Sequence, residues 1–441
     1  MVRLARRLRI DTPPNVVAAT HAALEGEGQK LINLSDSNPT RHNLFDQHIL
    51  EVVGQATKQA ALYDPDPRGP LIARSALAHY FGGAPNEYWL TSSTSQAYAW
   101  LLRILADPGD CIAIPLPGYP LIEPIARLAD LTVRPYASHY VEPDGWLLDA
   151  ASLSRAIAGQ ENQPRTSSNP AALGTDQIIG HHPPAVGATQ TIGHHPPAVA
   201  TNQTVDCEQM ARAVIVVNPG NPTGAYLAGS ARQTLVEQCA QAGVALLADE
   251  VFHRFAVELS PPPASFHGET ACVTFTLGGV SKLLAAPQLK LAWIHLSGPA
   301  EQTTLLSEAL DQVADMFLPV NQAVAVALPE LLSLAESSVQ TTHRRLANNL
   351  ATARRLLAAP HWRVRRCDGG WMVLVDYYGE QPATDHAELT VNLMRQAGLA
   401  VQPGWFYDLA SPNVLAISLL PDEQDFSATL SRLAGFASQT A

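Results

Sequence analysis

Short apolar runs alternate with amphipathic stretches along most of the chain. The runs at 111–117 (CIAIPLP), 213–219 (AVIVVNP) and 244–250 (VALLADE) are typical of strands buried on both faces. Beside them, 95–107 (SQAYAWLLRILAD) and 231–243 (ARQTLVEQCAQAG) place apolar residues at helical spacing. Strands that alternate with helices predict an α/β fold with a mostly parallel central sheet.

The second half of the chain follows a different pattern. A long helical pattern runs from about 301 to 357, and the stretches 363–378 and 413–420 are later strand candidates. This mixture predicts a smaller α+β domain in the C-terminal part. We therefore expect an N-terminal arm that belongs partly to the small domain at 1–45, a large domain at 46–299, and the small C-terminal domain at 300–441.

One segment fits neither pattern. Residues 160–206 are rich in Pro, Thr, Asn, Gln and Ala, and the sequence IGHHPPAVGATQ at 179–190 recurs as IGHHPPAVATNQ at 192–203. Two copies are too few for a solenoid. The histidines of the repeat have no carboxylate or cysteine beside them, so we predict a flexible surface insertion and no metal site.

Composition narrows the class of protein. Hydrophobic residues make up 46% of the 441, which excludes wholesale disorder, and the net charge of −12 disfavours a nucleic-acid partner. The five cysteines contain no CxxC pair, which predicts neither a zinc site nor a disulfide framework and favours a reducing cytoplasm. No uncharged apolar run approaches the ~18 residues of a membrane span, so no membrane partner is expected.

Candidate chemistry follows the predicted strands, because ligands of parallel sheets gather at the carboxyl ends of the strands. Ser281-Lys282 comes after a Gly-Gly pair that we interpret as a turn at the end of an apolar run. Partial desolvation there would lower the pKa of the lysine and free its amine as a nucleophile. The hydroxyls and backbone N–H groups of Ser93, Thr94 and Ser95 open a predicted helix and could hold a phosphate; the alternative is an ordinary N-cap.

Three further features follow predicted strands. The turn NPGNPTG at 218–224 would direct Asn221 into the cleft at the carboxyl ends of the strands. Asp249 is predicted to be a buried carboxylate, which needs a cation beside it, such as a protonated pyridine nitrogen. Tyr119, in PGYP at 117–120, could stack on a planar ring. Taken singly, these features also fit a plain turn, a salt-bridged strand end and a core tyrosine.

Together the motifs resemble the class I/II aminotransferases, which are pyridoxal-5′-phosphate (PLP) enzymes of fold type I. The order YDPDPRG, TSSTSQA, PGYP, NPGNPTG, DEVF and SK matches that family over about residues 30–420, apart from the 160–206 insertion. The resemblance implies that Lys282 forms the covalent link to PLP and moves the substrate proton. It further implies that Asp249 pairs with the pyridine nitrogen, that Asn221 binds the 3′-oxygen of the ring and the substrate, and that Tyr119 stacks on the ring.

The resemblance also implies how the cofactor phosphate is held. Ser93, Thr94, Ser95 and Lys290 would bind it, Ser281 would join the cofactor site, and no metal is involved. Tyr63 would reach the phosphate of a neighbouring subunit, since the sites of this family form at the interface of a homodimer. These residue assignments rest on matching motif positions in this sequence.

The sequence departs from the family at four places. The arginine expected eight residues after the lysine is Lys290, which keeps the charge and loses the bidentate fork. A tyrosine is replaced by Phe252, so we expect the lysine–cofactor link to titrate at a higher pH than is usual in the family. Ser37 replaces a loop glycine. The arginine that clamps the substrate carboxylate is missing, with Leu415 or Ala416 at that position.

A substitute for that arginine has to come from elsewhere, because a carboxylate in a dry site needs a charged partner. Arg41 follows SDSNPT directly and is the candidate; a solvated loop arginine is the alternative. The cluster Trp405, Phe406 and Tyr407 either lines the pocket or belongs to the domain core.

The function implied is transfer of an amino group between an amino acid or related amine and a 2-oxo acid, in a cytoplasmic homodimer. The missing arginine leaves open a PLP-dependent lyase, of the β-elimination or C–S type, or a decarboxylase of the same fold. A PLP-binding regulator is disfavoured, because only about 30 residues precede the matching region and the chain is acidic.

Overall fold

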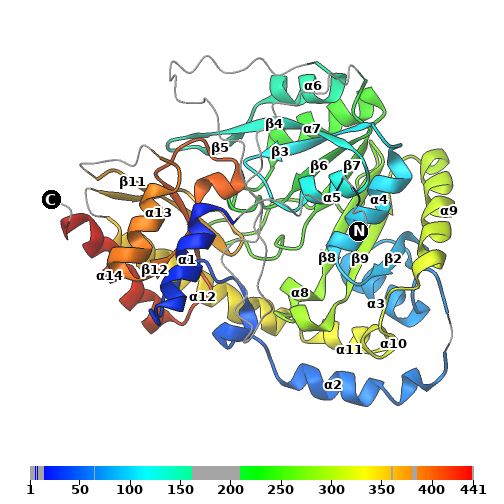
Figure 1. Cartoon of the computed structure of the whole chain (residues 1–441). Helices are drawn as coiled ribbons and strands as arrows, with labels where there is room; N and C mark the ends of the chain where they lie inside the picture. The colour runs from blue at the N-terminus through cyan, green and yellow to red at the C-terminus, as the bar shows by residue number, and fades with distance from the viewer. Residues whose placement is uncertain are drawn as a thin grey trace.

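The computed structural model describes residues 5, 7, 14–63, 65–160, 209–358, 361–379 and 385–439. An eight-stranded sheet lies at the centre of the large part of the chain, in the order β2-β9-β8-β7-β6-β3-β4-β5 (Figure 1). The strands are β2 (Tyr88–Thr91), β3 (Cys111–Leu116), β4 (Thr132–Val141), β5 (Gly145–Leu148), β6 (Ala213–Val217), β7 (Ala245–Asp249), β8 (Thr274–Gly279) and β9 (Ala292–Ser297).

Strands β4, β3, β6, β7 and β8 run parallel, and antiparallel pairing is confined to β2, β9 and β5. The predicted α/β class and mostly parallel sheet are therefore confirmed, and the runs at 111–117, 213–219 and 244–250 form β3, β6 and β7.

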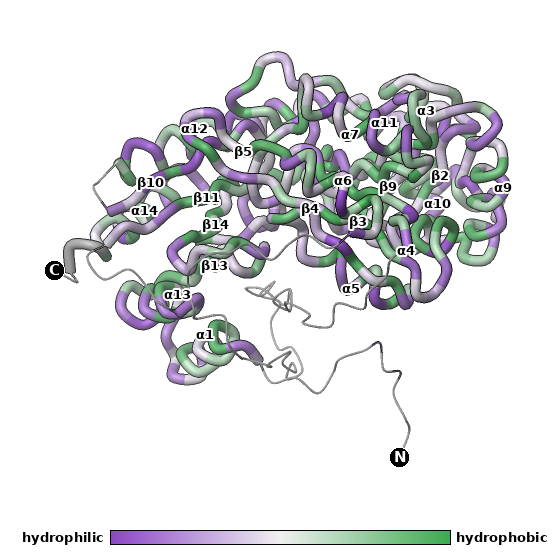
Figure 2. Tube along the Cα trace, turned by 90° about the horizontal axis from the view of Figure 1, so that it is seen from above, coloured by the Kyte–Doolittle hydropathy of each residue, from purple (hydrophilic) through white to green (hydrophobic). Residues whose placement is uncertain are grey.

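Helices cover both faces of this sheet. Ile215 of β6 packs in a core with α4, α5 and α9, whereas its neighbours Val214 and Val216 pack in a second core with α6 and α7. This alternation is what a strand buried on both faces requires. Figure 2 shows the hydrophobic positions concentrated along the strands. The covering helices are α4 (Thr94–Leu105), α5 (Ile122–Leu128), α6 (Ala150–Ala158), α7 (Gly229–Ala242) and α9 (Ala300–Phe317).

A second, antiparallel sheet lies in the C-terminal part, in the order β10-β11-β14-β13. Its strands are β10 (Trp362–Val364), β11 (Met372–Tyr377), β13 (Gln402–Pro403) and β14 (Val414–Ser418), and the helices of this part are α12 (Ala335–Leu356), α13 (Glu388–Asn392) and α14 (Glu423–Gln439). The N-terminal arm pairs with this part of the chain in a separate two-stranded sheet. There β1 (Ile32–Asn33), which follows α1 (Val16–Gly26), is parallel to β12 (Leu399–Ala400).

The long helical pattern from 301 to 357 is four helices rather than one. After α9, Leu318 takes a left-handed backbone and Asn321 caps the next helix with its side chain. The remaining segments are α10 (Gln322–Val326), α11 (Leu328–Ser333) and α12. The elements α2 (His48–Ala56) and α3 (Leu71–Phe81) pack against α10 and α11.

Within the described residues, none of the helices is both long enough and apolar enough to cross a membrane. The duplicated His-Pro repeats of 160–206 lie outside the described residues except Gln160, which follows α6.

Candidate active site

The polar motifs meet at one edge of the central sheet. Strands β3, β6, β7 and β8 are parallel, so their carboxyl ends point the same way, and Asp249 lies between Val217 and Leu277 in the strand register. The PGYP turn follows β3, the NPGNPTG turn follows β6, and Lys282 follows β8 in the short helix α8 (Val280–Leu283). The register thus brings these motifs together, as expected at the carboxyl ends of parallel strands.

The Gly-Gly pair before Lys282 is not a turn, which corrects the sequence interpretation. Gly278 and Gly279 are the last residues of β8, and Gly279 has an extended backbone that leads directly into α8. Gly278 is required by packing, because a Cβ there would lie 2.6 Å from ring atoms of Trp293 on the neighbouring strand. Because β8 has no side chain at this point, the Trp293 ring can pack against its backbone just before α8 begins.

The Lys282 amine lies against two aromatic rings. Its Nζ is 4.7 Å from the ring centroid of Trp371 and 5.3 Å from that of Phe252, and these two rings pack edge to face. Burial lowers the pKa of Lys282 to about 8, against an opposing effect of the Asp249 charge. The site therefore holds an amine that is partly neutral near physiological pH, which a nucleophile requires.

Asp249 is nine-tenths buried or more, with only 3% of its surface exposed. Burial raises the pKa of its carboxyl group to about 6, while hydrogen bonds from the Val251 N–H and the Tyr98 hydroxyl and the charge of Lys282 act in the other direction. Such a group gains most from a cation placed next to it in the dry site.

Buried hydrogen bonds hold the NPGNPTG turn. The fully buried Asn218 donates from Nδ2 to Glu250 Oε1 at 2.9 Å and accepts at Oδ1 from the Leu227 N–H at 2.9 Å. Glu250 also accepts from the Phe266 N–H and the Ser265 hydroxyl. The first asparagine of the motif is thus structural, and the second, Asn221, is left to face the pocket.

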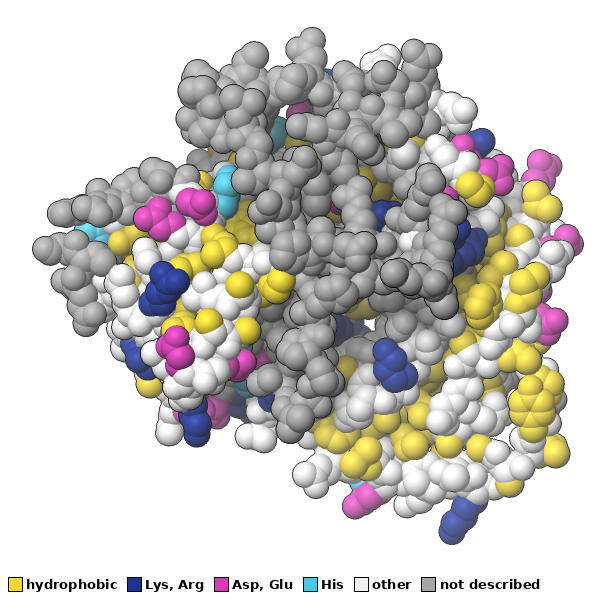
Figure 3. Space-filling model, in the orientation of Figure 1, with side chains coloured by type: hydrophobic (Ala, Val, Ile, Leu, Met, Phe, Trp, Pro, Cys, Tyr) yellow, Lys and Arg dark blue, Asp and Glu magenta, His cyan; other side chains and the backbone are white. Residues whose placement is uncertain are grey.

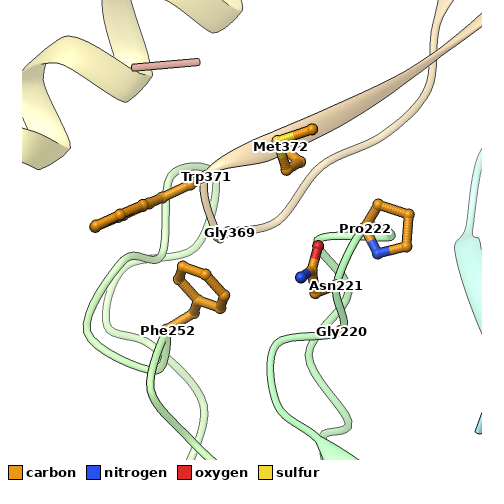
Figure 4. A pocket seen from close by; sticks show the side chains of 8 residues that line it. Gly220, Asn221, Pro222, Phe252, Gly369, Trp371 and Met372 are labelled. Carbon is orange, nitrogen blue, oxygen red and sulfur yellow. The ribbon is translucent and has the colours of Figure 1, made fainter. Parts of the chain in front are cut away.

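A small pocket lies beside this turn (Figure 4). The Phe252 ring and the Asn221 amide lie side by side, below Trp371 and Met372 in that view. Gly220, Pro222, Gly369 and Gly370 complete the lining. The pocket thus joins residues of the large sheet region to residues at the start of β11.

The hydroxyl-rich segment opens α4, as predicted. Ser93 is the N-cap, and its Oγ accepts from the Gln96 N–H at 3.2 Å; Thr94 and Ser95 are half-buried in the first turn. The helix begins close to Lys282, because Thr91 pairs with Ala292 and Ala292 pairs with Gly279.

The predicted phosphate ligand Lys290 and the predicted cofactor residue Ser281 lie in the segment between β8 and β9. Ser281 is half-buried in α8, and Lys290, two residues before Ala292, is exposed with a left-handed backbone. The Tyr119 side chain is near enough to Asp249 for the carboxylate charge, together with burial, to raise the pKa of its hydroxyl.

Other predicted residues are not brought into this group. Tyr63 is 77% exposed. The Arg41 guanidinium forms an ion pair with Asp36, 3.2 Å between Nη1 and Oδ2. Ala416 is fully buried on β14, with Leu374 and Gln402 as strand partners.

The aromatic cluster at 405–407 fits partly with each of the two alternatives from the sequence, a pocket lining and a domain core. Phe406 and Tyr407 are buried in a hydrophobic core, with Trp405 packed against it. The segment also touches the active-site edge, because the Gly118 N–H donates to the Tyr407 carbonyl at 3.3 Å.

Sequence reasoning missed two residues that touch the predicted machinery. Trp371 contributes a ring face to Lys282, and its only sequence signal is the Gly-Gly pair that precedes it. Tyr98 donates its hydroxyl to Asp249 Oδ2 at 3.1 Å. It stands at an apolar position of the helical pattern of α4, so the sequence indicates burial and nothing of the hydrogen bond.

Comparison with known proteins finds the same family that the sequence motifs resemble. The family model "Aminotransferase class I and II" matches residues 29–432. The alanine aminotransferase of Mycobacterium tuberculosis is 24% identical over 434 residues, covering 94% of this chain and 88% of that protein. The glutamate-pyruvate aminotransferase of Escherichia coli is 21% identical and covers 71% of this chain and 67% of its own.

Among solved structures, the alanine aminotransferase of Pyrococcus furiosus superposes with a TM-score of 0.80 at 17% identity, covering 99% of this chain and all of that chain. The aspartate aminotransferase of Thermus thermophilus with maleate gives 0.73 at 20% identity, with coverage of 99% and 100%. These likenesses confirm the fold. The named relatives lend no support to a lyase or a decarboxylase.

Proposed function

This chain belongs to the class I and II aminotransferases and is a PLP-dependent aminotransferase of fold type I, and we propose that Lys282 is the residue that binds the cofactor and moves the substrate proton. The observation that carries this role is the environment of the amine. Its Nζ lies over the Trp371 and Phe252 rings, and burial holds its pKa at about 8. A lysine in this state serves as nucleophile and as general base near neutral pH.

The residues around Lys282 fit the cofactor. When bound, PLP supplies an electron sink for the pair released at the substrate Cα. Asp249 is a buried carboxylate suited to a protonated ring nitrogen, and Asn221 presents an amide in the pocket for the ring oxygen and the substrate. Tyr119 is proposed to stack on the ring, which its closeness to Asp249 supports.

The residues at the N-terminus of α4 also fit the phosphate group of the cofactor. The α4 N-terminus offers backbone N–H groups and the hydroxyls of Ser93, Thr94 and Ser95, and a helix N-terminus favours an anion. Ser281 and Lys290 flank it from the segment between β8 and β9. In this proposal residues 46–299 hold the cofactor, and the N-terminal arm (1–45) together with 300–441 supplies the rest of the pocket.

Substrates are an amino donor and a 2-oxo acid. The relatives named alanine and glutamate–pyruvate aminotransferase make glutamate as donor and pyruvate as acceptor the first pair to test, with alanine as the donor for the reverse reaction. A screen of donors and acceptors, followed by absorbance of the bound cofactor, is the experiment. Return of the aminated cofactor to its starting spectrum on adding a 2-oxo acid supports transamination. Release of pyruvate and ammonia with no acceptor present contradicts it and favours elimination.

Arg41 is the proposed clamp for the substrate carboxylate, because Ala416 cannot supply one. Arg41→Ala should raise the donor KM about 10-fold or more, since a charge-assisted hydrogen bond is lost. Arg103→Ala, at an exposed position of α4, is the matched control and should leave KM unchanged. Equal KM values for the wild type and Arg41→Ala remove this role.

The enzyme is proposed to act as a homodimer. Exposed apolar side chains gather around α2, α3 and α9, where Figure 3 shows hydrophobic atoms along the right side and lower part of the view. Contiguous exposed apolar surface marks an interaction site. The residues are Leu50, Leu62, Leu71, Ile72, Leu305, Met316 and Phe317. Tyr63 lies among them in sequence and is proposed to reach the cofactor phosphate of the other subunit.

Sedimentation tests the dimer. Leu62→Asp and Leu71→Asp should shift the wild-type dimer towards monomer, because each places a charge in the apolar surface. Leu147→Asp, at an exposed position of β5 away from this surface, is the control. A monomeric wild type contradicts the proposal. We place the enzyme in the cytoplasm, in line with the buried free thiols of Cys239 and Cys272 among the described residues.

A further inference from the structure

The Asp249 carboxylate is fixed from two directions. Oδ1 accepts from the Val251 N–H at 3.2 Å, and Oδ2 accepts from the Tyr98 hydroxyl at 3.1 Å. Tyr98 is 1% exposed, so water does not compete for this bond. A carboxylate offers about four acceptor positions, so one donor on each oxygen still leaves a position for a cation.

The hydroxyl of Tyr98 is more than a packing feature. Phenylalanine would fill the same volume, and a buried hydroxyl without a partner would cost free energy, so the oxygen is present for its hydrogen bond. Burial and the Asp249 charge raise the pKa of Tyr98 well above its usual value, which keeps the group a donor. The other titratable groups that act on Asp249 are Lys282 on α8, Glu250 directly after β7, and Tyr119 after β3.

Tyr98 also lies one helical turn after Thr94, in the helix α4 that Ser93 caps. One rigid element therefore contacts the proposed phosphate position at its first turn and the Asp249 carboxylate at its second. We propose that Tyr98 is a positioning residue, which holds the Asp249 carboxylate ionised and facing the cofactor ring nitrogen and thereby keeps that nitrogen protonated. This inference rests on the proposed role of Asp249.

The test compares two cofactors on the full chain. PLP is titrated against the cofactor-free protein in parallel with an analogue whose ring nitrogen is replaced by CH. Tyr98→Phe should bind PLP about 10-fold more weakly, the effect of a lost hydrogen bond to a charged group, and should bind the CH analogue as the wild type does. The absorbance of the PLP-loaded variant should titrate at a higher pH, because a ring without its nitrogen charge repels a second proton less.

Tyr136→Phe is the matched control. Tyr136 is also buried in this sheet region, but its hydroxyl donates to the Ile215 carbonyl, so neither cofactor should lose affinity selectively. Equal losses for PLP and the CH analogue in Tyr98→Phe, with an unchanged titration, overturn the inference. Asp249→Asn distinguishes failure of the Tyr98 inference from failure of the proposed role of Asp249. If it discriminates between the cofactors and Tyr98→Phe does not, the Tyr98 inference alone fails; if Asp249→Asn does not discriminate either, the proposed role of Asp249 fails with it.

Discussion

The Lys282 amine should be far more reactive near neutral pH than the amine of an ordinary solvent-exposed lysine. The chain has only four lysines, at positions 30, 58, 282 and 290, which makes each of them separately measurable. Burial lowers the pKa of Lys282 from 10.5 to about 8. At about pH 7.5, an amine with a pKa of 8 is roughly one quarter neutral, whereas one with a pKa of 10.5 is about 0.1% neutral, so the reactive fraction rises about 200-fold.

Competitive labelling measures this directly. The cofactor-free protein receives trace acetic anhydride at several values between about pH 6 and about pH 10, and mass spectrometry gives the rate at each lysine. Each rate is divided by the rate in denaturant, which removes local sequence effects. The ratio of Lys282 to the exposed Lys58 should be highest below pH 8 and fall above it, and PLP should abolish labelling at Lys282. A ratio that stays constant across this range refutes the reasoning.

Three further predictions concern hydrogen bonds and packing in the large sheet region. Asn218→Ala removes two buried hydrogen bonds, one of them to a carboxylate, and should cost about 3 kcal/mol, seen as a lower thermal midpoint. Gly278→Ala should lower the midpoint because its Cβ would meet the Trp293 ring. Gly435→Ala in α14 is the control: an added Cβ there meets no atom within 4 Å apart from the helix's own backbone, so alanine should raise the midpoint slightly, and equal shifts would contradict this. His295, whose pKa burial holds at about 3, stays neutral in the fold while its unfolded form takes up protons below 6.5. Stability should therefore fall by up to about 1.4 kcal/mol per pH unit between those values, and His295→Gln should show a shallower acid transition; an equally steep one speaks against the buried neutral imidazole.

The features that were predictable from the sequence are those set by neighbouring residues. The strands β3, β6 and β7 follow from short apolar runs, and the position of Asp249 at a carboxyl end follows from where its run stops. Ser93 as the cap of α4 follows from its place before an amphipathic stretch. Each of these depends on local pattern and on the geometry shared by all parallel sheets.

The features that escaped prediction depend on contacts between distant segments. Gly278 looks like a turn residue until Trp293 on the adjacent strand is seen to occupy the space of its side chain. Tyr98 and Trp371 come from separate parts of the chain and meet Asp249 and Lys282 only through the fold. The end of α9 is a different case, because Pro319 directly after Leu318 is a local stop signal that the long helical pattern from 301 to 357 did not take into account.

The central claim is that the cofactor is attached at Lys282, and borohydride reduction of the PLP-saturated protein tests it most directly. Reduction makes the lysine–cofactor link permanent, and trypsin then fails to cut at the modified residue. The account predicts the cofactor mass on the peptide that spans Lys282, with normal cleavage at Lys290 eight residues later. Cofactor found on Lys290, on another lysine, or on no peptide contradicts it.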